Sequence, residues 1–288
     1  MSLAIQRVGG AVLVGLLLGY GGLVGILAWA EDRLVYPVVP WTRKLAAPRF
    51  DLNLHPKRVT TTTTDGAHLV GWLMAGDDAS PWILIFHGNA GNIADGGRPD
   101  HYARLRALGL NVLTFDYRGY GESDGVATEV GLYRDADASF RFLLDSLQVP
   151  AARIWIFGHS LGSAVAVDLA SRVKAAGLIL EGAFTSAPDA ARYAYPFVPV
   201  RSLMHNRFAS DEKIGRTRMP KLFLHSEEDR VIPITLGRRL FDKASGSKRF
   251  VTLHGGHDDA FLVDSASYFT AIAEFCHSSE LEHGCKAY

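Results

Sequence analysis

Two Gly-x-Ser-x-Gly pentapeptides are the first places in the chain where residue types and spacing could support nucleophilic chemistry. In the second, Gly158–Gly162, Ser160 follows the strand-like run Arg153–Phe157 and precedes the helical pattern Leu161–Lys174. A nucleophile elbow needs this strand–turn–helix context, because the sharp turn exposes the serine hydroxyl above the end of a sheet. The helix N-terminus beyond the turn also favours negative charge nearby. We therefore predict that Ser160 is a catalytic nucleophile.

The other pentapeptide, Gly121–Gly125, has the same pattern in a different context. It lies in a polar, glycine-rich stretch, and no helical pattern begins directly after it. Glu122 and Asp124 flank its Ser123, and carboxylates so close would disfavour a developing alkoxide. We predict that this pentapeptide is a structural loop.

A serine hydroxyl is a poor nucleophile until a base takes its proton. His257 follows two glycines after the strand-like run Arg249–Leu253, in a loop that could reach the elbow. His254 is an alternative that lies closer to the end of the run, and His225 precedes the candidate acids. We predict that His257 is the base.

Three carboxylates follow the strand-like run Lys221–His225, and one of them could orient the imidazole: Glu227, Glu228 and Asp229. Asp229 is preferred because regular structure restarts directly after it, and Glu228 remains an alternative. The chain order Ser160, Asp229, His257 is one of the orders found in serine-hydrolase triads. In such a triad the acid holds the imidazole tautomer and stabilises the imidazolium.

An oxyanion hole is expected where small residues end an early strand, at Phe86–Asn92. There the backbone could approach a substrate oxygen closely, and the amides of Asn89 and Leu161 form the natural donor pair. A phosphate-binding loop is the competing interpretation. It fails because neither Gly-Lys-Ser/Thr nor Gly-x-Gly-x-x-Gly is present here.

The elements around these residues alternate between short apolar runs and longer periodic stretches. The predicted strands are 82–86, 112–116, 154–158, 177–180 and 222–225, and the predicted helices are 102–108, 129–147, 161–174, 235–244 and 264–276. An Asp65-Gly66 turn joins two further strands, 58–64 and 67–75. Such alternation predicts an α/β fold with a mostly parallel sheet and helices on both faces.

One segment interrupts this alternation. Residues 183–218 contain no long periodic run and separate two predicted strands by more than an ordinary connection. We predict a short cap insertion over a cleft. Its aromatic and proline residues could line an acyl pocket, or the segment could be a surface excursion packed on itself.

The N-terminal residues 1–30 form a separate region. The uncharged run Val8–Ala30 would span about 34 Å as a helix, enough for a hydrocarbon core of about 30 Å. We favour an uncleaved signal anchor over a signal peptide cleaved after Ala28-Trp29-Ala30, because signal h-regions are usually shorter. Residues 31–57 then form an irregular juxtamembrane linker, 58–277 the catalytic domain and 278–288 a C-terminal tail.

Composition and cysteine content narrow the remaining possibilities. Lys plus Arg and Asp plus Glu both total 30, so no basic excess is available to bind nucleic acid. The 11 histidines show no metal-ligand spacing, so neither metal nor cofactor is expected. Cys276 and Cys285 could pair if the domain faces an oxidising space, or be two unrelated thiols. Charges flank both ends of the apolar run, and we favour a catalytic domain outside the cytoplasm.

At these residues the sequence resembles the bud-emergence type of membrane-anchored α/β-hydrolases, which are related to protein depalmitoylases and lysophospholipid lipases. The matching segments are 32–37, 86–92, 116–123, 158–162, 178–186 and those around Asp229 and His257. The resemblance implies an α/β-hydrolase fold, the triad above and an uncleaved anchor. The chain departs from this family at Glu181–Phe184, where relatives tend to have Ser-Pro before the Phe. We expect this change at the mouth of the cap, where it would affect substrate preference.

Two functions are consistent with these patterns. The first is a serine hydrolase that cleaves carboxylic esters or thioesters through an acyl-enzyme, without a cofactor, on lipid-like or acylated substrates at a membrane. The second is a non-catalytic membrane-anchored scaffold that keeps the hydrolase fold. Every expected catalytic part is present in the sequence, which favours the enzyme.

Overall fold

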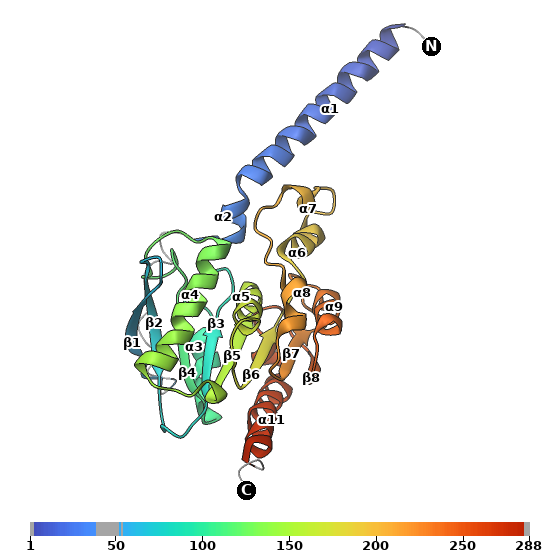
Figure 1. The fold of residues 1–288 in the computed structure, drawn as a ribbon. Helices are drawn as coiled ribbons and strands as arrows, with labels where there is room; N and C mark the ends of the chain where they lie inside the picture. The colour runs from blue at the N-terminus through green and yellow to red at the C-terminus, as the bar shows by residue number, and fades with distance from the viewer. Residues whose placement is uncertain (1–2, 39–51, 53, 285–288) are drawn as a thin grey trace.

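The computed structural model of the protein describes residues 3–38, 52 and 54–284, and its centre is one eight-stranded sheet (Figure 1). The strand order is β1-β2-β4-β3-β5-β6-β7-β8. Pairing is antiparallel between β1 and β2 and between β2 and β4, and parallel for all other neighbours. The strands are β1 (Lys57–Thr62), β2 (His68–Met74), β3 (Trp82–Phe86), β4 (Asn111–Phe115), β5 (Ile154–His159), β6 (Gly177–Glu181), β7 (Lys221–Ser226) and β8 (Lys248–Leu253). The mostly parallel sheet is confirmed.

Helices cover both faces of this sheet, as predicted. The cores beneath them divide by face: α4, α5 and α9 contribute to one hydrophobic cluster, whereas α3 and α11 contribute to the other. Short turns η3 (Phe142–Ser146), η4 (Ala151–Arg153) and η5 (Ile214–Arg216) complete the regular structure. The helices are α1 (Leu3–Trp29), α2 (Glu31–Val35), α3 (Arg98–Ala107), α4 (Glu129–Arg141), α5 (Leu161–Ala170), α6 (Ala187–Ala194), α7 (Val200–Leu203), α8 (Ser210–Lys213), α9 (Ile234–Lys243), α10 (Ala260–Val263) and α11 (Ser265–Gly284).

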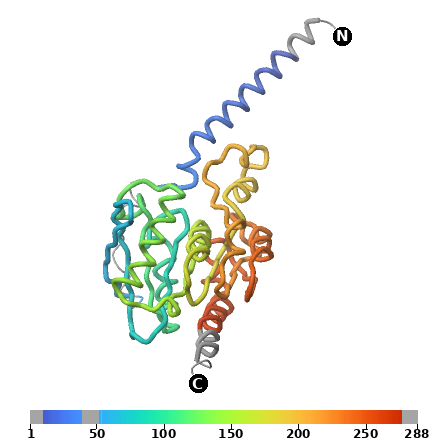
Figure 2. The backbone as a smooth tube through the Cα atoms, viewed as in Figure 1, coloured from blue at the N-terminus to red at the C-terminus, as the bar shows by residue number. Residues whose placement is uncertain are grey.

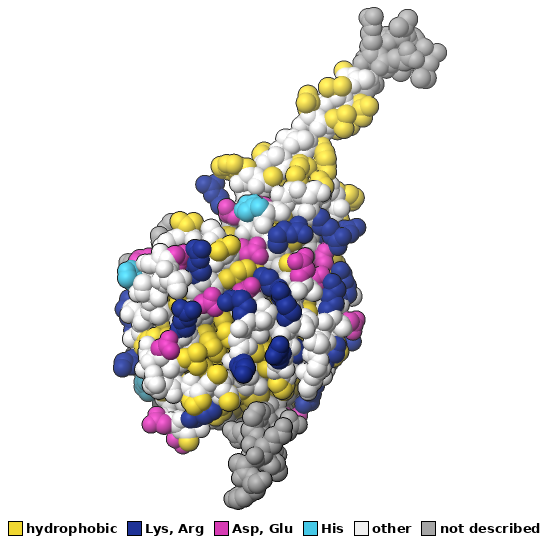
Figure 3. All heavy atoms as spheres, viewed as in Figure 1, with side chains coloured by type: hydrophobic (Ala, Val, Ile, Leu, Met, Phe, Trp, Pro, Cys, Tyr) yellow, Lys and Arg dark blue, Asp and Glu magenta, His cyan; other side chains and the backbone are white. Residues whose placement is uncertain are grey.

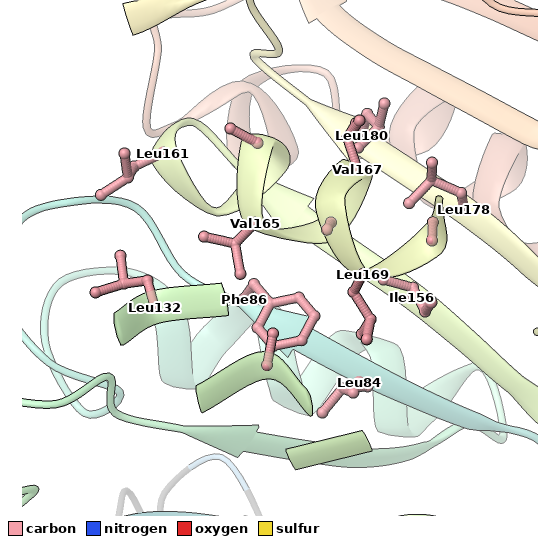
Figure 4. Close-up of a cluster of buried hydrophobic side chains, with 14 of the residues drawn as sticks. Leu84, Phe86, Leu132, Ile156, Leu161, Val165, Val167, Leu169, Leu178 and Leu180 are labelled. Atoms are coloured by element: carbon pink, nitrogen blue, oxygen red, sulfur yellow. The ribbon is translucent and has the colours of Figure 1, made fainter. Parts of the chain in front are cut away.

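Strand β3 shows why its sequence is an unbroken apolar run. All five of its residues are buried. Leu84 and Phe86 join the cluster under α5, while Ile83 and Ile85 join the cluster under α3 and α11. Because successive strand residues point to opposite faces, a strand covered on both sides must be apolar throughout. Figure 4 shows the first cluster, with the side chains of α5 packed over those of β3, β5 and β6.

The N-terminal helix α1 projects away from the catalytic domain (Figure 2). Within the described residues it contains the one helix long and apolar enough to cross a membrane, Gly10–Trp29, and none of that stretch is buried. Apolar side chains surround it, and charged side chains gather on the visible face of the domain below it (Figure 3).

The prediction of an irregular linker directly after this helix is wrong for its first residues. Glu31–Val35 forms α2, and Glu31 is buried. Its carboxylate Oε1 accepts hydrogen bonds from the backbone amide and side-chain amide of Asn206 at 2.8 and 2.9 Å. These bonds hold the segment against the domain. Residues 39–51 and 53 of the predicted linker lie outside the described residues.

The insertion between β6 and β7 lies beside the base of α1 (Figures 1 and 2). It contains α6, which the sequence analysis missed, together with the shorter α7 and α8. Ser186 caps α6 by accepting a hydrogen bond from the amide of Asp189.

At the C-terminal end, α11 extends to Gly284, past the predicted boundary between domain and tail. Helix α5 ends earlier than predicted, at Ala170. Cys276 is buried. The predicted pairing of Cys276 lies outside the described residues, because these end before Cys285.

Candidate active site

Ser160 occupies a sharp turn between β5 and α5. Its backbone has φ 53° and ψ −120°, a strained combination for a residue with a side chain. A hydrogen bond of 2.9 Å from the Ser160 amide to the Glu181 carbonyl ties the turn to β6. A Cβ on Gly158 would lie 2.3 Å from the Gly162 carbonyl oxygen, and a Cβ on Gly162 would lie 2.1 Å from the Phe86 carbonyl oxygen. Both positions therefore require glycine.

The structure brings together the three side chains predicted to form the triad. His257 Nε2 lies 2.8 Å from Ser160 Oγ, and His257 Nδ1 lies 2.6 Å from Asp229 Oδ2. With its proton on Nδ1 facing the carboxylate, the imidazole presents the Nε2 lone pair to the serine hydroxyl. This is the geometry that general-base activation of a serine needs.

Asp229 is itself fixed by backbone donors. Its Oδ1 accepts hydrogen bonds from the amides of Val231 and Ile232, both at 2.8 Å. The residues weighed as alternatives lie elsewhere. Glu228 accepts a hydrogen bond from the Gly255 amide at 3.1 Å, and the exposed His254 ring lies near Glu227. Both act around the loop that carries His257 instead of on Ser160.

Charge within the site favours an ionised acid beside a basic imidazole. Burial alone would lower the pKa of His257, but the hydrogen bond and charge of Asp229 outweigh it, so the pKa is raised above its ordinary value. Burial would raise the pKa of Asp229, but His257 and the two amides outweigh it, so that pKa is lowered. The pair is therefore suited to accept a proton on the imidazole while the carboxylate stays ionised.

The predicted oxyanion donors line the same cavity as Ser160. Asn89 lies in the loop after β3, and Leu161 is the first residue of α5. Among the described residues, neither of the two backbone amides donates to another protein group. Both are therefore available to a ligand oxygen above Ser160. The Asn89 side chain donates to the Val35 carbonyl at 3.2 Å, which links this loop to α2.

Two tyrosines support the oxyanion loop, and the sequence analysis missed them. Tyr117 donates its hydroxyl proton to the His87 carbonyl at 3.0 Å, and Tyr120 donates to the Asn89 carbonyl at 2.9 Å. Because these carbonyls are held from one side, the orientation of the adjacent peptide units is fixed. The signal in the sequence was two aromatic residues in a glycine-rich loop directly after a strand.

The cavity above Ser160 has a volume of about 280 Å³ and is almost entirely apolar. Cap residues of α6 and α7 form one side and residues of α1 and α2 form another. This supports the interpretation of the insertion as a cap over a cleft. Its lining includes Leu27, Ala28, Glu31, Leu34, Val35, Phe184, Ala187, Ala190, Ala191, Ala194, Tyr195, Val198, Val200, Leu203, Met204, Val231 and Ile232.

The expectation that Glu181 lies at the mouth of the cap is wrong. Its side chain instead lines a second cavity of about 310 Å³, together with His101, Phe157 and His159. Tyr268 donates its hydroxyl proton to Glu181 Oε2 at 2.9 Å. Burial raises the pKa of Glu181 to about 7. Since the charge of Glu181 also contributes to the raised pKa of His257, the departure from the family pattern affects the triad and not the acyl pocket.

One group of side chains among the described residues could offer three metal ligands: His159, His257 and Asp258, whose donor atoms lie within 4.8 Å of one another. A metal there would compete with Ser160 and Asp229 for the ring nitrogens of His257. The absence of a bound metal stays a prediction.

Comparison with known proteins gives a family match and several relatives. Residues 78–214 match the family described as serine aminopeptidase, S33. An uncharacterized protein of Mycobacterium tuberculosis is 39% identical over 220 residues, which cover 75% of this chain and 78% of that protein. Protein bem46 of Schizosaccharomyces pombe is 30% identical over 272 residues, 90% of this chain and 89% of that protein. The lysophosphatidylserine lipase ABHD12 of Danio rerio is 36% identical over 206 residues, but these cover only 52% of that protein and 65% of this chain.

Solved structures support the same fold. An esterase of Pyrococcus furiosus superposes with a TM-score of 0.68 at 22% identity, covering 82% of this chain and 97% of that chain. An α/β-hydrolase of Vibrio vulnificus gives 0.69 at 21% identity, covering 86% and 92%. At such identities the likeness concerns the fold alone. The similarity to bem46 extends along nearly the whole of both chains, and this chain therefore belongs to the α/β-hydrolase family that includes bem46 and ABHD12.

Proposed function

We propose that the protein is a serine hydrolase that cleaves carboxylic ester or thioester bonds through an acyl-enzyme, on lipid-like or acylated substrates at a membrane surface. The single observation that carries the proposal is the continuous set of contacts from Asp229 through His257 to Ser160, below an apolar cavity. The lipase and esterase activities named for the relatives agree with this substrate class.

In the first half of the reaction, Ser160 Oγ bonds to the acyl carbon while its proton passes to His257 Nε2. The carbonyl oxygen becomes an oxyanion that the amides of Asn89 and Leu161 hold. The bond from the acyl carbon to the leaving oxygen or sulfur then breaks, and the leaving group takes the proton from His257. The product of this half is an acyl-enzyme on Ser160.

In the second half, water attacks the acyl carbon and gives a proton to His257 Nε2. The bond from the carbon to Ser160 Oγ then breaks, and the serine recovers its proton from the imidazole. The carboxylic acid leaves, and the enzyme returns to its starting state. Asp229 stabilises the imidazolium in both halves and keeps its own charge.

The membrane part of the proposal rests on α1. Gly10–Trp29 has a mean hydropathy of 2.2 in its most apolar window and none of that window is buried. A helix of this kind next to the catalytic domain suits a single-pass anchor. The domain would then meet substrates that reside in the bilayer. The side of the membrane on which it lies stays a prediction.

A fluorophosphonate probe tests the nucleophile directly, because it reacts covalently with an activated serine. We expect the intact protein to be labelled and Ser160→Ala to be silent. Ser123→Ala is the matched control, since it removes the serine of the other pentapeptide, and its labelling should persist. Labelling of Ser160→Ala would overturn the assignment. A silent wild type with a normal thermal transition would favour the scaffold.

A further inference from the structure

The last turn of α1 lies against the cavity above Ser160. Leu27 and Ala28 line that cavity and are half-buried, whereas the side chain of Ile26 on the same turn is 63% exposed. The helix therefore turns one face toward the active site and the other toward its surroundings. An anchor that served only as a tether would not need to contribute to the wall of a binding site.

The contact between α1 and the domain is held by specific hydrogen bonds. Below the cavity, the buried Glu31 accepts from the amides of His205 and Asn206 at 3.1 and 2.8 Å. Higher up, Tyr20 donates its hydroxyl proton to the Phe197 carbonyl of the cap at 2.7 Å. Bonds at two levels fix both the angle and the rotation of the helix relative to the cap.

The upper contact has a further meaning if α1 spans a bilayer. Tyr20 lies nine residues before Trp29, or about 14 Å along the helix axis. Trp29 and the guanidinium of Arg33, which lies 4.9 Å from its ring centroid, suit the interfacial layer. The cap loop at Phe197 then lies within the apolar layer. There its carbonyl needs a partner inside the protein, which Tyr20 supplies. The Phe197 side chain is 87% exposed, as expected of a group in contact with lipid.

The lining of the cavity identifies its occupant by chemistry. Apart from Glu31, which is engaged by the bonds above, the polar lining lies at the Ser160 end, with Asn89. The side chains between that end and α1 are almost all aliphatic or aromatic. An ester carbonyl suits the polar end and a hydrocarbon chain suits the remainder.

We propose that the last turn of α1 is a wall of the acyl-binding site, and that a long-chain acyl ester passes its chain into the cavity from the leaflet around α1 and the cap loop. This inference rests on the proposed ester hydrolysis and names the residues that select its substrate. It assigns Leu27 and Ala28 to chain selectivity and Phe197 to contact with the leaflet.

The first experiment fills the wall. The full chain is placed in phosphatidylcholine vesicles, and kcat/KM is measured for p-nitrophenyl palmitate in the vesicles and for p-nitrophenyl butyrate from water. We expect Ala28→Phe to lower the palmitate-to-butyrate ratio about tenfold or more, since a filled apolar pocket rejects the longer chain. The matched control is Ile26→Phe, the same new side chain on the opposite face of the same turn, which should keep the wild-type ratio.

An unchanged ratio in Ala28→Phe, or an equal drop in Ile26→Phe, would overturn the α1 wall. Fluorophosphonate labelling of Ser160 is measured in every variant to show that the domain is folded. A wild type that hydrolyses neither ester would instead contradict the proposed function, so the two failures are distinguishable.

The second experiment tests the source of the chain. Phe197→Asp places a charge in the loop beside α1, and we expect it to lower hydrolysis of the vesicle-borne palmitate ester about tenfold relative to the butyrate ester. Val126→Asp is the control, because it changes another exposed apolar residue that lies outside the cap and the cavity. If Phe197→Asp keeps the wild-type ratio, the chain reaches the cavity from water and the leaflet route is wrong.

Discussion

The two Gly-x-Ser-x-Gly pentapeptides share a pattern and have opposite surroundings. Ser123 is 1% exposed, and its hydroxyl donates to the Asp116 carbonyl at 2.8 Å and accepts from the Val70 amide at 2.9 Å. Ser160 is 8% exposed, has a positive φ, and meets the His257 ring. The prediction of a structural loop at Ser123 is confirmed. Reactivity at these serines depends on the group that the hydroxyl touches, because backbone groups cannot take its proton as an imidazole can.

The difference arises from the element that comes after each serine in the chain. Helix α5 begins directly after Ser160, so the chain must turn sharply there. After Gly125 the chain continues as a loop until α4 begins at Glu129. The loop around Ser123 also supplies Tyr117 and Tyr120, which hold the oxyanion loop. The first pentapeptide therefore supports the site that the second one forms.

The largest expected effect comes from removing the base that only Ser160 possesses. We expect His257→Ala to lower kcat/KM for a soluble ester by about 10⁴-fold or more, because the hydroxyl loses its proton acceptor. Steady-state kinetics with p-nitrophenyl butyrate measures this. His254→Ala, the exposed histidine of the same loop, should remain within about twofold of wild type. Comparable losses in both variants would contradict the assignment.

The second test compares glycines of the two pentapeptides. A Cβ on Gly162 would meet the Phe86 carbonyl oxygen at 2.1 Å, whereas on Gly125 its nearest neighbour would be Arg118 Cβ at 3.6 Å. Gly162→Ala should therefore lower the free energy of unfolding by about 3 kcal/mol or more, since backbone must move. Gly125→Ala has only the strain of its positive φ, about 1 kcal/mol. Urea denaturation distinguishes the two, and equal losses would show that the elbow tolerates a side chain.

A smaller effect is expected at the buried serine itself. Ser123→Ala leaves the Val70 amide and the Asp116 carbonyl without this partner, which should lower the free energy of unfolding by about 1–2 kcal/mol. Activity on the soluble ester should be retained, because no reacting group is touched. Thermal unfolding and kinetics are measured on the same preparation. Loss of activity with unchanged stability would mean that this serine takes part in the reaction.

The smallest effect concerns pH. Activity needs a neutral His257, so it should fall as the pH drops through the raised pKa of this imidazole. Glu181→Gln removes a negative charge that favours the imidazolium, so the pKa of His257 should fall and the acid limb should move to lower pH by a few tenths of a unit. The pH dependence of kcat/KM measures the shift. A limb that stays fixed or moves upward would show that Glu181 does not act on the triad.

Patterns local in sequence predicted most of the fold. The run Trp82–Phe86 has the bounds of β3, and the strand–turn–helix context located the elbow at Ser160. The order of acid and base after their strands led to Asp229 and His257. These predictions succeed because the ends of parallel strands meet at one edge of a sheet, where loops converge.

The predictions that failed concern pairs that only the folded chain brings together. Glu31 lies against Asn206, and Tyr20 lies against Phe197, across more than 170 residues in each case. No periodicity in the sequence joins such residues, so α2 looked like a linker. The side to which Glu181 points was also open, because a residue at the end of a strand can face either layer.

The docking of α2 means that the phase of the anchor helix matters as well as its hydrophobicity. Each residue of an α-helix advances by about 100° around the axis. One alanine inserted between Ala30 and Glu31 would keep the span apolar but rotate every side chain of α1 relative to the cap. Leu27 and Ala28 would leave the cavity, and the Tyr20 hydroxyl would leave the Phe197 carbonyl. A chimera with a foreign span of equal length would inherit the same constraint, so anchors in this protein are interchangeable only in register.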